Sequence, residues 1–158
     1  MTDLPLTRTT PHKQSGPTIL MVDDDVAILN GFRRNLGRRF NLTCANGAEE
    51  ALALIKEKPP FAVIVTDMRM PDMDGLQFIL SAREAEKSRD SIYMMLTGNA
   101  DQNTADNAIE QGQIYRFLNK PCEREQLESA LIAAIEMYQR NAAGGADNGT
   151  DAASDVAA

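Results

Sequence analysis

The chain has 158 residues, of which 43% are hydrophobic and 25% are charged, and it carries a formal net charge of -7. This size and composition suit a single globular domain, and the net acidity argues against direct contact with nucleic acid. No stretch long enough to span a bilayer is free of charged residues, and the N-terminus lacks the apolar core of a signal peptide, so we expect a cytoplasmic protein without membrane contact.

Five runs of apolar and β-branched residues predict the strands of a buried sheet. In chain order they cover residues 18–22, 41–45, 61–67, 91–96 and 115–119. The third run, Phe-Ala-Val-Ile-Val-Thr-Asp, is apolar on both faces, which is typical of a central strand.

Apolar residues at helical spacing follow each strand and predict five helices. In chain order these lie between the acidic loop and about residue 39, over residues 48–55, over residues 76–83, over residues 101–111, and over about residues 123–140. In the fourth helix only Ala105, Ala108 and Ile109 form the apolar face. We therefore expect this helix to be loosely held.

Strictly alternating strands and helices predict an α/β fold with parallel strands and right-handed crossovers. We expect a doubly wound, flavodoxin-like sheet of five strands in the order 2-1-3-4-5, with five helices, in a single domain over residues 17–140. Residues 1–16 lack periodicity and are interpreted as a flexible lead-in. The small, polar residues of 141–158 predict a disordered tail or a truncated linker.

Functional side chains follow the carboxyl ends of four predicted strands, where open α/β sheets bind their ligands. They are Asp23, Asp24 and Asp25 after the first strand, Asp67 at the end of the third, Thr97 after the fourth and Lys120 after the fifth. Carboxylates gathered at one edge repel one another, and a bound hard cation relieves that repulsion. Asp25 is better placed to cap the following helix, whereas Asp72 and Asp74 suit a loop.

Four motifs contain these residues and together carry a family resemblance. They are Val22-Asp23-Asp24-Asp25, the stretch from Thr66 to Gly75, Leu96-Thr97-Gly98, and Lys120-Pro121. In this order they resemble the receiver domain of two-component response regulators. The resemblance implies that Asp67 accepts a phosphoryl group from a histidine kinase or phosphotransfer protein, while Thr97 and Lys120 contact the phosphoryl oxygens. It also implies a cis bond between Lys120 and Pro121.

The same resemblance implies Mg²⁺ as the cofactor, held by Asp23, Asp24, Asp67 and the backbone carbonyl of Arg69. The chemistry agrees with these residue types. A carboxylate that attacks phosphorus is an anion approaching an anionic donor, so a cation and a lysine ammonium must offset the repulsion. Mg²⁺ prefers carboxylate and carbonyl oxygens.

A conformational switch at Thr97 and Phe117 is also implied by the resemblance. Phosphorylation would draw the Thr97 hydroxyl inward and leave space for the aromatic ring of Phe117. Tyr115 would lie on the same side of the strand and share this role, although Phe117 fits a plain core position equally well. The responding surface would comprise the fourth helix, the fifth strand and the last helix. The resemblance further implies that Arg69 and Asn99 occupy positions that tune the phosphoryl lifetime.

Several alternatives remain at this level. We expect a signalling domain rather than an enzyme, because Arg69 stands where an aspartyl-phosphate phosphatase of the haloacid-dehalogenase type carries its second aspartate. An interaction module that is never phosphorylated would not need the full set of site residues. The chain would act on a downstream protein partner or output domain, alone or as a homodimer. Alternatively it is the N-terminal receiver fragment of a larger regulator, such as an HD-GYP cyclic-di-GMP phosphodiesterase.

Overall fold

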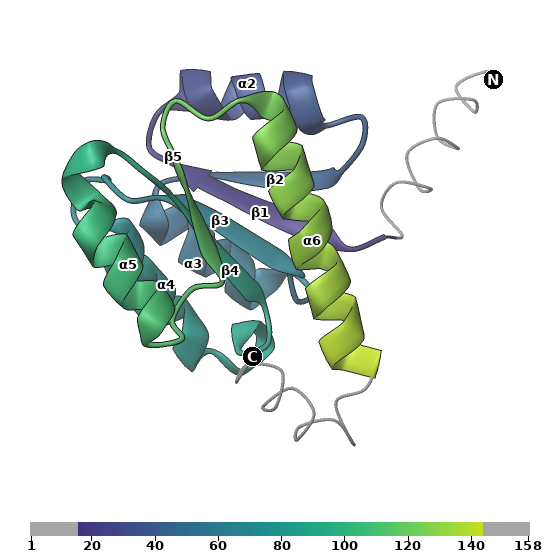
Figure 1. Ribbon diagram of the computed structural model, residues 1–158. Coiled ribbons are helices and arrows are strands. Elements are labelled where there is room, and N and C mark those ends of the chain that lie inside the picture. Colours follow the sequence, from purple (N-terminus) through teal and green to yellow (C-terminus); the bar gives the residue numbers. More distant parts are fainter. Residues whose placement is uncertain (1–15, 144–158) are drawn as a thin grey trace.

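A computed structural model of the chain describes residues 16–143, which form a parallel sheet flanked by helices (Figure 1). The sheet has five strands in the order β2-β1-β3-β4-β5, as the sequence predicts. The strands are β1 (Thr18–Asp23), β2 (Asn41–Asn46), β3 (Val63–Asp67), β4 (Ile92–Thr97) and β5 (Arg116–Asn119). The reversal of strand order beside β1 makes the fold doubly wound, so the functional edge lies at the carboxyl ends of β1 and β3.

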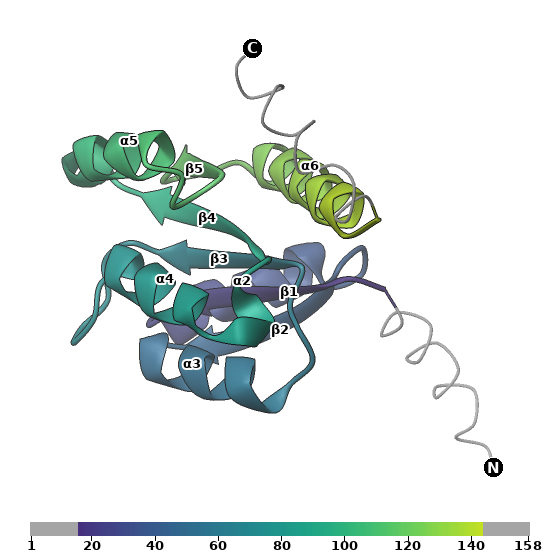
Figure 2. The ribbon, with the colours of Figure 1, turned by 90° about the horizontal axis from the view of Figure 1, so that it is seen from below.

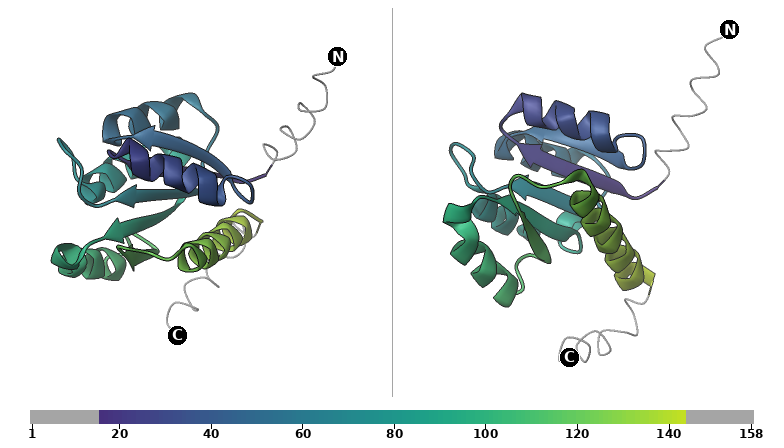
Figure 3. Two further views of the ribbon diagram at one scale, coloured as in Figure 1. Left: turned by 90° about the horizontal axis from the view of Figure 1, so that it is seen from above. Right: turned by 45° about the horizontal axis from the view of Figure 1, so that its top comes forward.

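Helices cover both faces of the sheet (Figure 2). They are α2 (Val26–Leu36), α3 (Ala48–Glu57), α4 (Gly75–Glu84), α5 (Gln102–Glu110) and α6 (Arg124–Ala143), with short 3₁₀ turns η1 (Glu86–Ser88) and η2 (Asn99–Asp101). Buried residues of α3, α4 and α5 pack in one cluster, and those of α2 and α6 pack in the other. Figure 3 shows α2 and α6 together on one face of the sheet.

Alternation along the strands explains why two cores form. In β1, Leu20 and Val22 belong to the cluster under α3, α4 and α5, whereas Ile19 and Met21 belong to the cluster under α2 and α6. Successive side chains of a strand point to opposite faces, so a strand covered on both sides must be apolar at nearly every position. Every residue of β3 is buried, which confirms it as the central strand.

Two helices end about three residues away from their predicted ends. The first helix ends at Leu36 rather than near Arg39, because the chain turns there and carries Phe40 into the core, where its backbone N–H donates to the Leu36 carbonyl. The last helix continues through Ala143, three residues beyond the predicted end. The predicted lead-in up to residue 15 and the tail from residue 144 lie outside the described residues.

The fourth predicted helix, α5, has the small apolar face that the sequence indicates. Ala105 and Ala108 are buried, but Ile109 is 39% exposed and contributes little to the core. By contrast, α4 buries Phe78, Ile79 and Ala82 completely. Over residues 16–143, no helix combines the length and the apolar character needed to cross a bilayer.

Candidate functional site

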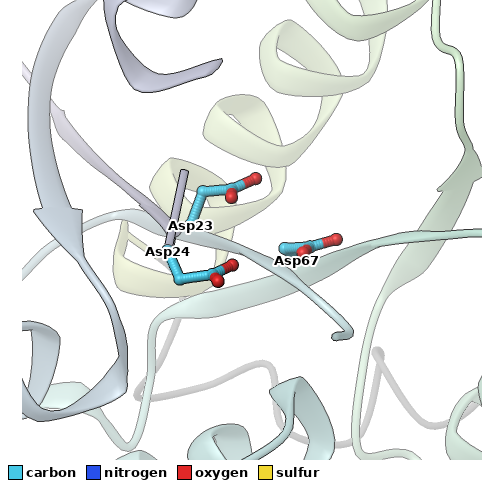
Figure 4. A group of neighbouring side chains, drawn as sticks. All are labelled: Asp23, Asp24 and Asp67. Carbon is cyan, nitrogen blue, oxygen red and sulfur yellow. The ribbon is translucent and has the colours of Figure 1, made fainter. Parts of the chain in front are cut away.

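Three carboxylates from two strands meet at the carboxyl edge of the sheet. Asp23 ends β1, Asp24 follows it, and Asp67 ends β3, with one oxygen of each lying within 4.8 Å of the others. Figure 4 shows the three side chains side by side. The parallel register that pairs Val22 with Thr66 brings Asp23 beside Asp67. Asp23 and Asp67 are buried and Asp24 is exposed, so the cluster opens to solvent on the Asp24 side.

The backbone after β1 fixes the carboxylate of Asp23. The N–H of Asp25 donates to Oδ1 of Asp23 at 2.9 Å, and the carboxylate of Asp25 accepts from the N–H of Ala27 at the same distance. Asp25 is therefore the N-cap of α2, as the sequence predicts. The three consecutive aspartates divide their tasks between the cluster and the helix cap.

The charge balance of the cluster fits a bound cation. Burial raises the pKa of Asp23 to about 6, opposed by the hydrogen bond from Asp25 and reinforced by the charge of Asp67. Its second oxygen, Oδ2, is buried without a hydrogen-bond partner among the described residues. Buried polar atoms are normally satisfied, and carboxylate oxygens are among the ligands that Mg²⁺ prefers. The residues present therefore suit Mg²⁺.

Lys120 lies on the other side of Asp67. Its Nζ donates to Oδ1 of Asp67 at 2.7 Å, and its backbone N–H donates to the Thr97 carbonyl at 2.7 Å. Burial opposes the lysine charge, but the hydrogen bond to Asp67 and the charges of Asp67 and Asp23 outweigh it and raise the pKa of Lys120. The Lys120–Pro121 bond is cis, which confirms the expectation drawn from the family resemblance.

Thr97 ends β4 beside the acceptor strand, where Leu96 pairs with Asp67. The side chain is fully buried, yet its hydroxyl oxygen has no hydrogen-bond partner within residues 16–143. A buried hydroxyl without a partner costs about 1–3 kcal/mol. Thr97 therefore lies at the same edge of the sheet as Asp67, but its hydroxyl makes no hydrogen bond to Asp67.

Two residues behind the acceptor were not assigned to the site by the sequence. The Thr66 hydroxyl donates to the Asp67 carbonyl at 2.9 Å. Gly75 was named only as the end of the motif that contains Asp67, but it is the buried first residue of α4, and its N–H donates to the Met68 carbonyl at 2.8 Å. A Cβ at Gly75 would collide with the Asp67 carbonyl oxygen. This position therefore requires glycine because the helix approaches the acceptor backbone closely.

Of the two neighbouring acids that were predicted as loop residues, Asp74 has a different role. Asp74 is the N-cap of α4 and forms a capping box with Gln77, in which each side chain bonds the other residue's backbone N–H. Aspartate followed by glutamine three residues later is the sequence signal for this cap. Asp72 does lie in the loop, at a φ of 70°.

Arg69 has a side-chain partner that the sequence did not indicate. Its Nε donates to Oδ2 of Asp101, and its Nη2 donates to Oδ1 of the same residue, both at 2.9 Å. Asp101 lies in η2. Asp101 was predicted only as the start of the following helix. The two residues are 32 positions apart, so helical periodicity carries no signal for their contact.

The two aromatic residues near β5 lie on different faces of the sheet. Phe117 is partly buried against the cluster under α3, α4 and α5, and it pairs in register with Met95. Tyr115 packs against the opposite cluster, under α2 and α6. The prediction that Tyr115 shares the side of Phe117 is therefore wrong. Because β5 begins only at Arg116, the strict alternation of a strand does not extend to Tyr115.

The fold and the site together define a class of protein: doubly wound α/β domains with an acidic cluster and a lysine at the carboxyl edge of the sheet. Comparison with known families identifies it further. The profile of the response regulator receiver domain matches residues 19–132, and the chain belongs to this family.

Curated relatives agree with this assignment. The acid tolerance regulatory protein ActR of Sinorhizobium medicae is 32% identical over 134 residues, covering 83% of this chain and 67% of ActR. The hydrogenase transcriptional regulatory protein HoxA of Bradyrhizobium diazoefficiens is 29% identical over 122 residues, which are 77% of this chain but 24% of HoxA. The chain thus spans about a quarter of the length of that relative.

Solved structures show the same likeness. A structure described as adenylate cyclase from Rhodopirellula baltica matches with a TM-score of 0.79 and 45% identity, covering 82% of this chain and 95% of that one. The signal receiver domain of an HD domain-containing protein from Pseudomonas fluorescens matches with a TM-score of 0.71 and 28% identity, covering 79% and 98% of the two chains. Both similarities span nearly the whole matched chain.

Proposed function

We propose that this receiver domain accepts a phosphoryl group on Asp67, in a Mg²⁺-dependent reaction with a histidine kinase or phosphotransfer protein as donor. The observation that carries the proposal is the position of Asp67 between two sets of charges. Lys120 bonds it at 2.7 Å, and Asp23 and Asp24 complete a carboxylate cluster within 4.8 Å. A nucleophilic carboxylate beside an ammonium group and a cation site is the arrangement that phosphoryl transfer to an aspartate requires.

In the transfer step, an oxygen of Asp67 attacks phosphorus and a new P–O bond forms. The bond from phosphorus to the donor's nitrogen or oxygen breaks, and its electron pair leaves with the donor. Lys120 lies where it can neutralise charge on the transferred oxygens. Asp23, Asp24 and the Arg69 carbonyl would hold Mg²⁺ with Asp67, and when bound this ion offsets the repulsion between the acceptor and its anionic donor.

The response to phosphorylation is proposed to pass through Thr97 and Phe117. The Thr97 hydroxyl is buried without a partner among the described residues, so it is available for a phosphoryl oxygen at no cost in existing hydrogen bonds. Strand alternation places Thr97 on the face of Met95, the residue that pairs with Phe117. The surface formed by α5, β5 and α6 would then change and bind a downstream partner or a second copy of the domain.

A second candidate is that the domain regulates a larger protein. The HoxA relative is about four times as long as the region that it shares with this chain, which is 24% of HoxA. The solved neighbours described as an adenylate cyclase and as part of an HD domain-containing protein point to further kinds of output. An attached output domain, such as an HD-GYP phosphodiesterase, would bind the surface formed by α5, β5 and α6.

The test of the proposed acceptor is intact mass after incubation with acetyl phosphate and Mg²⁺. The wild-type protein and Asp72→Asn should each gain one phosphoryl group, because Asp72 is a loop acid outside the cluster. Asp67→Asn should gain none, and chelation of Mg²⁺ should abolish the gain in all proteins. A mass gain that persists in Asp67→Asn, or the absence of any gain in the wild type with both acetyl phosphate and a histidine kinase, would contradict the proposal.

A further inference from the structure

The ion pair between Arg69 and Asp101 joins an exposed guanidinium group to a largely buried carboxylate. Both guanidinium contacts measure 2.9 Å and engage both carboxylate oxygens, so the pair is bidentate. The side chain of Asp101 is 9% exposed and that of Arg69 is 72% exposed. A bidentate pair with one buried partner has a defined orientation, unlike most exposed ion pairs. The guanidinium therefore has a fixed place.

Both partners lie close in sequence to the residues of the proposed site. Arg69 is two positions after Asp67, and Asp101 is four positions after Thr97. The Cα atoms of Arg69 and Asp67 are therefore at most about 7 Å apart, which is comparable to the length of an extended arginine side chain. The pair connects the loop after β3 to the turn that begins α5.

The charges around Arg69 indicate where its guanidinium is directed. The hydrogen bond and the charge of Asp101 raise the pKa of Arg69, desolvation opposes this rise, and the charge of Asp74 adds to it. Neither of these acids belongs to the three-carboxylate cluster. With Asp67 unmodified, the positive charge nearest in sequence to the acceptor is thus turned toward α5 instead.

Asp101 holds Arg69 instead of capping α5 with its side chain. It occupies the N-cap position of α5, but within the described chain its side chain makes no capping hydrogen bond to that helix. Aspartate is a favoured N-cap residue, so its carboxylate would ordinarily accept from the helix N–H groups. Here both of its oxygens bind the guanidinium.

We propose that Asp101 is a positioning residue that withholds Arg69 from the phosphoryl-accepting site, and that an incoming phosphoryl group competes with Asp101 for the guanidinium. This inference rests on the proposed function, since it concerns the rate at which Asp67 is phosphorylated. Releasing Arg69 adds one positive charge beside the acceptor, which attracts an anionic donor. Transfer of the guanidinium to the phosphoryl group also frees the first turn of α5, which links the acceptor to the responding surface.

A double-mutant cycle on the phosphorylation rate separates this role from a simple change of charge. The proteins are wild type, Asp101→Asn, Arg69→Gln and the double variant, with acetyl phosphate as the donor at low ionic strength. Asp101→Asn should raise the rate on the order of threefold when Arg69 is present, because an unpaired charge acts through a solvent-like dielectric over several ångströms. In the Arg69→Gln background, Asp101→Asn should change the rate much less. The threefold gain should shrink as salt is added.

A matched control and a spectroscopic signature complete the test. Asp106→Asn makes the same change in net charge at an exposed position of α5 and should leave the rate near that of the wild type. The Arg69 Nε–H should give a slowly exchanging NMR signal in the unphosphorylated protein, and Asp101→Asn should abolish it.

Equal effects of Asp101→Asn in the two backgrounds, or an Arg69 signal that survives Asp101→Asn, would overturn the inference while leaving the acceptor assignment intact. Failure of every protein to gain a phosphoryl group would instead overturn the proposed function. The two failures are therefore distinct.

Discussion

Two regions of the molecule differ in how deeply they are buried: β3 with α4, called here the firm half, and β5 with α5, called the weakly anchored half. On the side of β3 and α4, every strand residue is buried and the helix anchors Phe78, Ile79 and Ala82 without exposure. On the side of β5 and α5, the strand residues are partly buried or exposed, and only Ala105 and Ala108 of the helix are buried. Local stability follows buried apolar contact, so the acceptor stands on the firm half and faces the half that can move at low cost.

The largest expected difference between the halves comes from the same substitution in α4 and α5. Ile79→Ala removes a fully buried side chain and should lower the free energy of unfolding by about 2–5 kcal/mol. Ile109→Ala alters a side chain that is 39% exposed and should cost less than about 1 kcal/mol. Urea denaturation of both variants checks this. Similar losses in the two proteins would mean that α5 is anchored as firmly as α4.

Because of Asp23, the free energy of unfolding of the metal-free protein should fall as the pH rises. Its pKa in the folded protein is about 6, above the ordinary value, so the folded state binds the proton more tightly than the unfolded state. Stability is then highest below the unfolded pKa and is lost as the pH rises through about 4 to 6. Asp23→Asn should remove this loss and stabilise the metal-free protein at neutral pH by up to about 3 kcal/mol.

Asp25→Asn is the matched control, because Asp25 is exposed and asparagine also caps helices. Thermal unfolding between pH 4 and 8, with and without Mg²⁺, measures both variants. Addition of Mg²⁺ should stabilise the wild type more than Asp23→Asn. A wild-type protein whose metal-free stability is flat across this pH range would contradict the assigned environment of Asp23.

Gly75→Ala should lower the free energy of unfolding by displacing the backbone of Asp67, with a smaller effect than that of Ile79→Ala. The added Cβ would meet the Asp67 carbonyl oxygen, and overpacking of this kind costs about 1–3 kcal/mol. Gly98→Ala, beside Thr97, meets no heavy atom within 4 Å and should be nearly neutral. Chemical denaturation combined with the phosphorylation rate compares the two. Equal behaviour of the variants would show that the close approach of α4 does not position Asp67.

The parts of this molecule that were predictable from sequence are those encoded by local patterns. Apolar runs marked the strands, and the topology of alternating elements then brought Asp23, Asp67 and Lys120 to one edge. The cap at Asp25 followed from its place before an amphipathic segment. In each case, neighbouring residues contain the information.

The parts that were missed depend on tertiary approach. The Arg69–Asp101 pair joins long side chains from separate loops, and the need for glycine at position 75 arises only where α4 meets the acceptor backbone. The faces of Tyr115 and Phe117 were misjudged because the strand begins between them. Periodicity describes a strand once it exists but does not locate its first residue to within one position.

The central claim is that phosphorylation of the firmly built acceptor changes the weakly anchored half. Its most direct test is backbone NMR of the protein with Mg²⁺, before and after addition of beryllofluoride, an analogue of the phosphoryl group. We expect the largest amide shifts outside the site itself over β4, α5 and β5, with small shifts in α3. In Thr97→Val, which keeps the side-chain shape but lacks the hydroxyl, the analogue should still bind while the shifts in α5 largely disappear. Binding that leaves α5 unchanged in the wild type, or shifts α3 and α5 equally, would contradict the account.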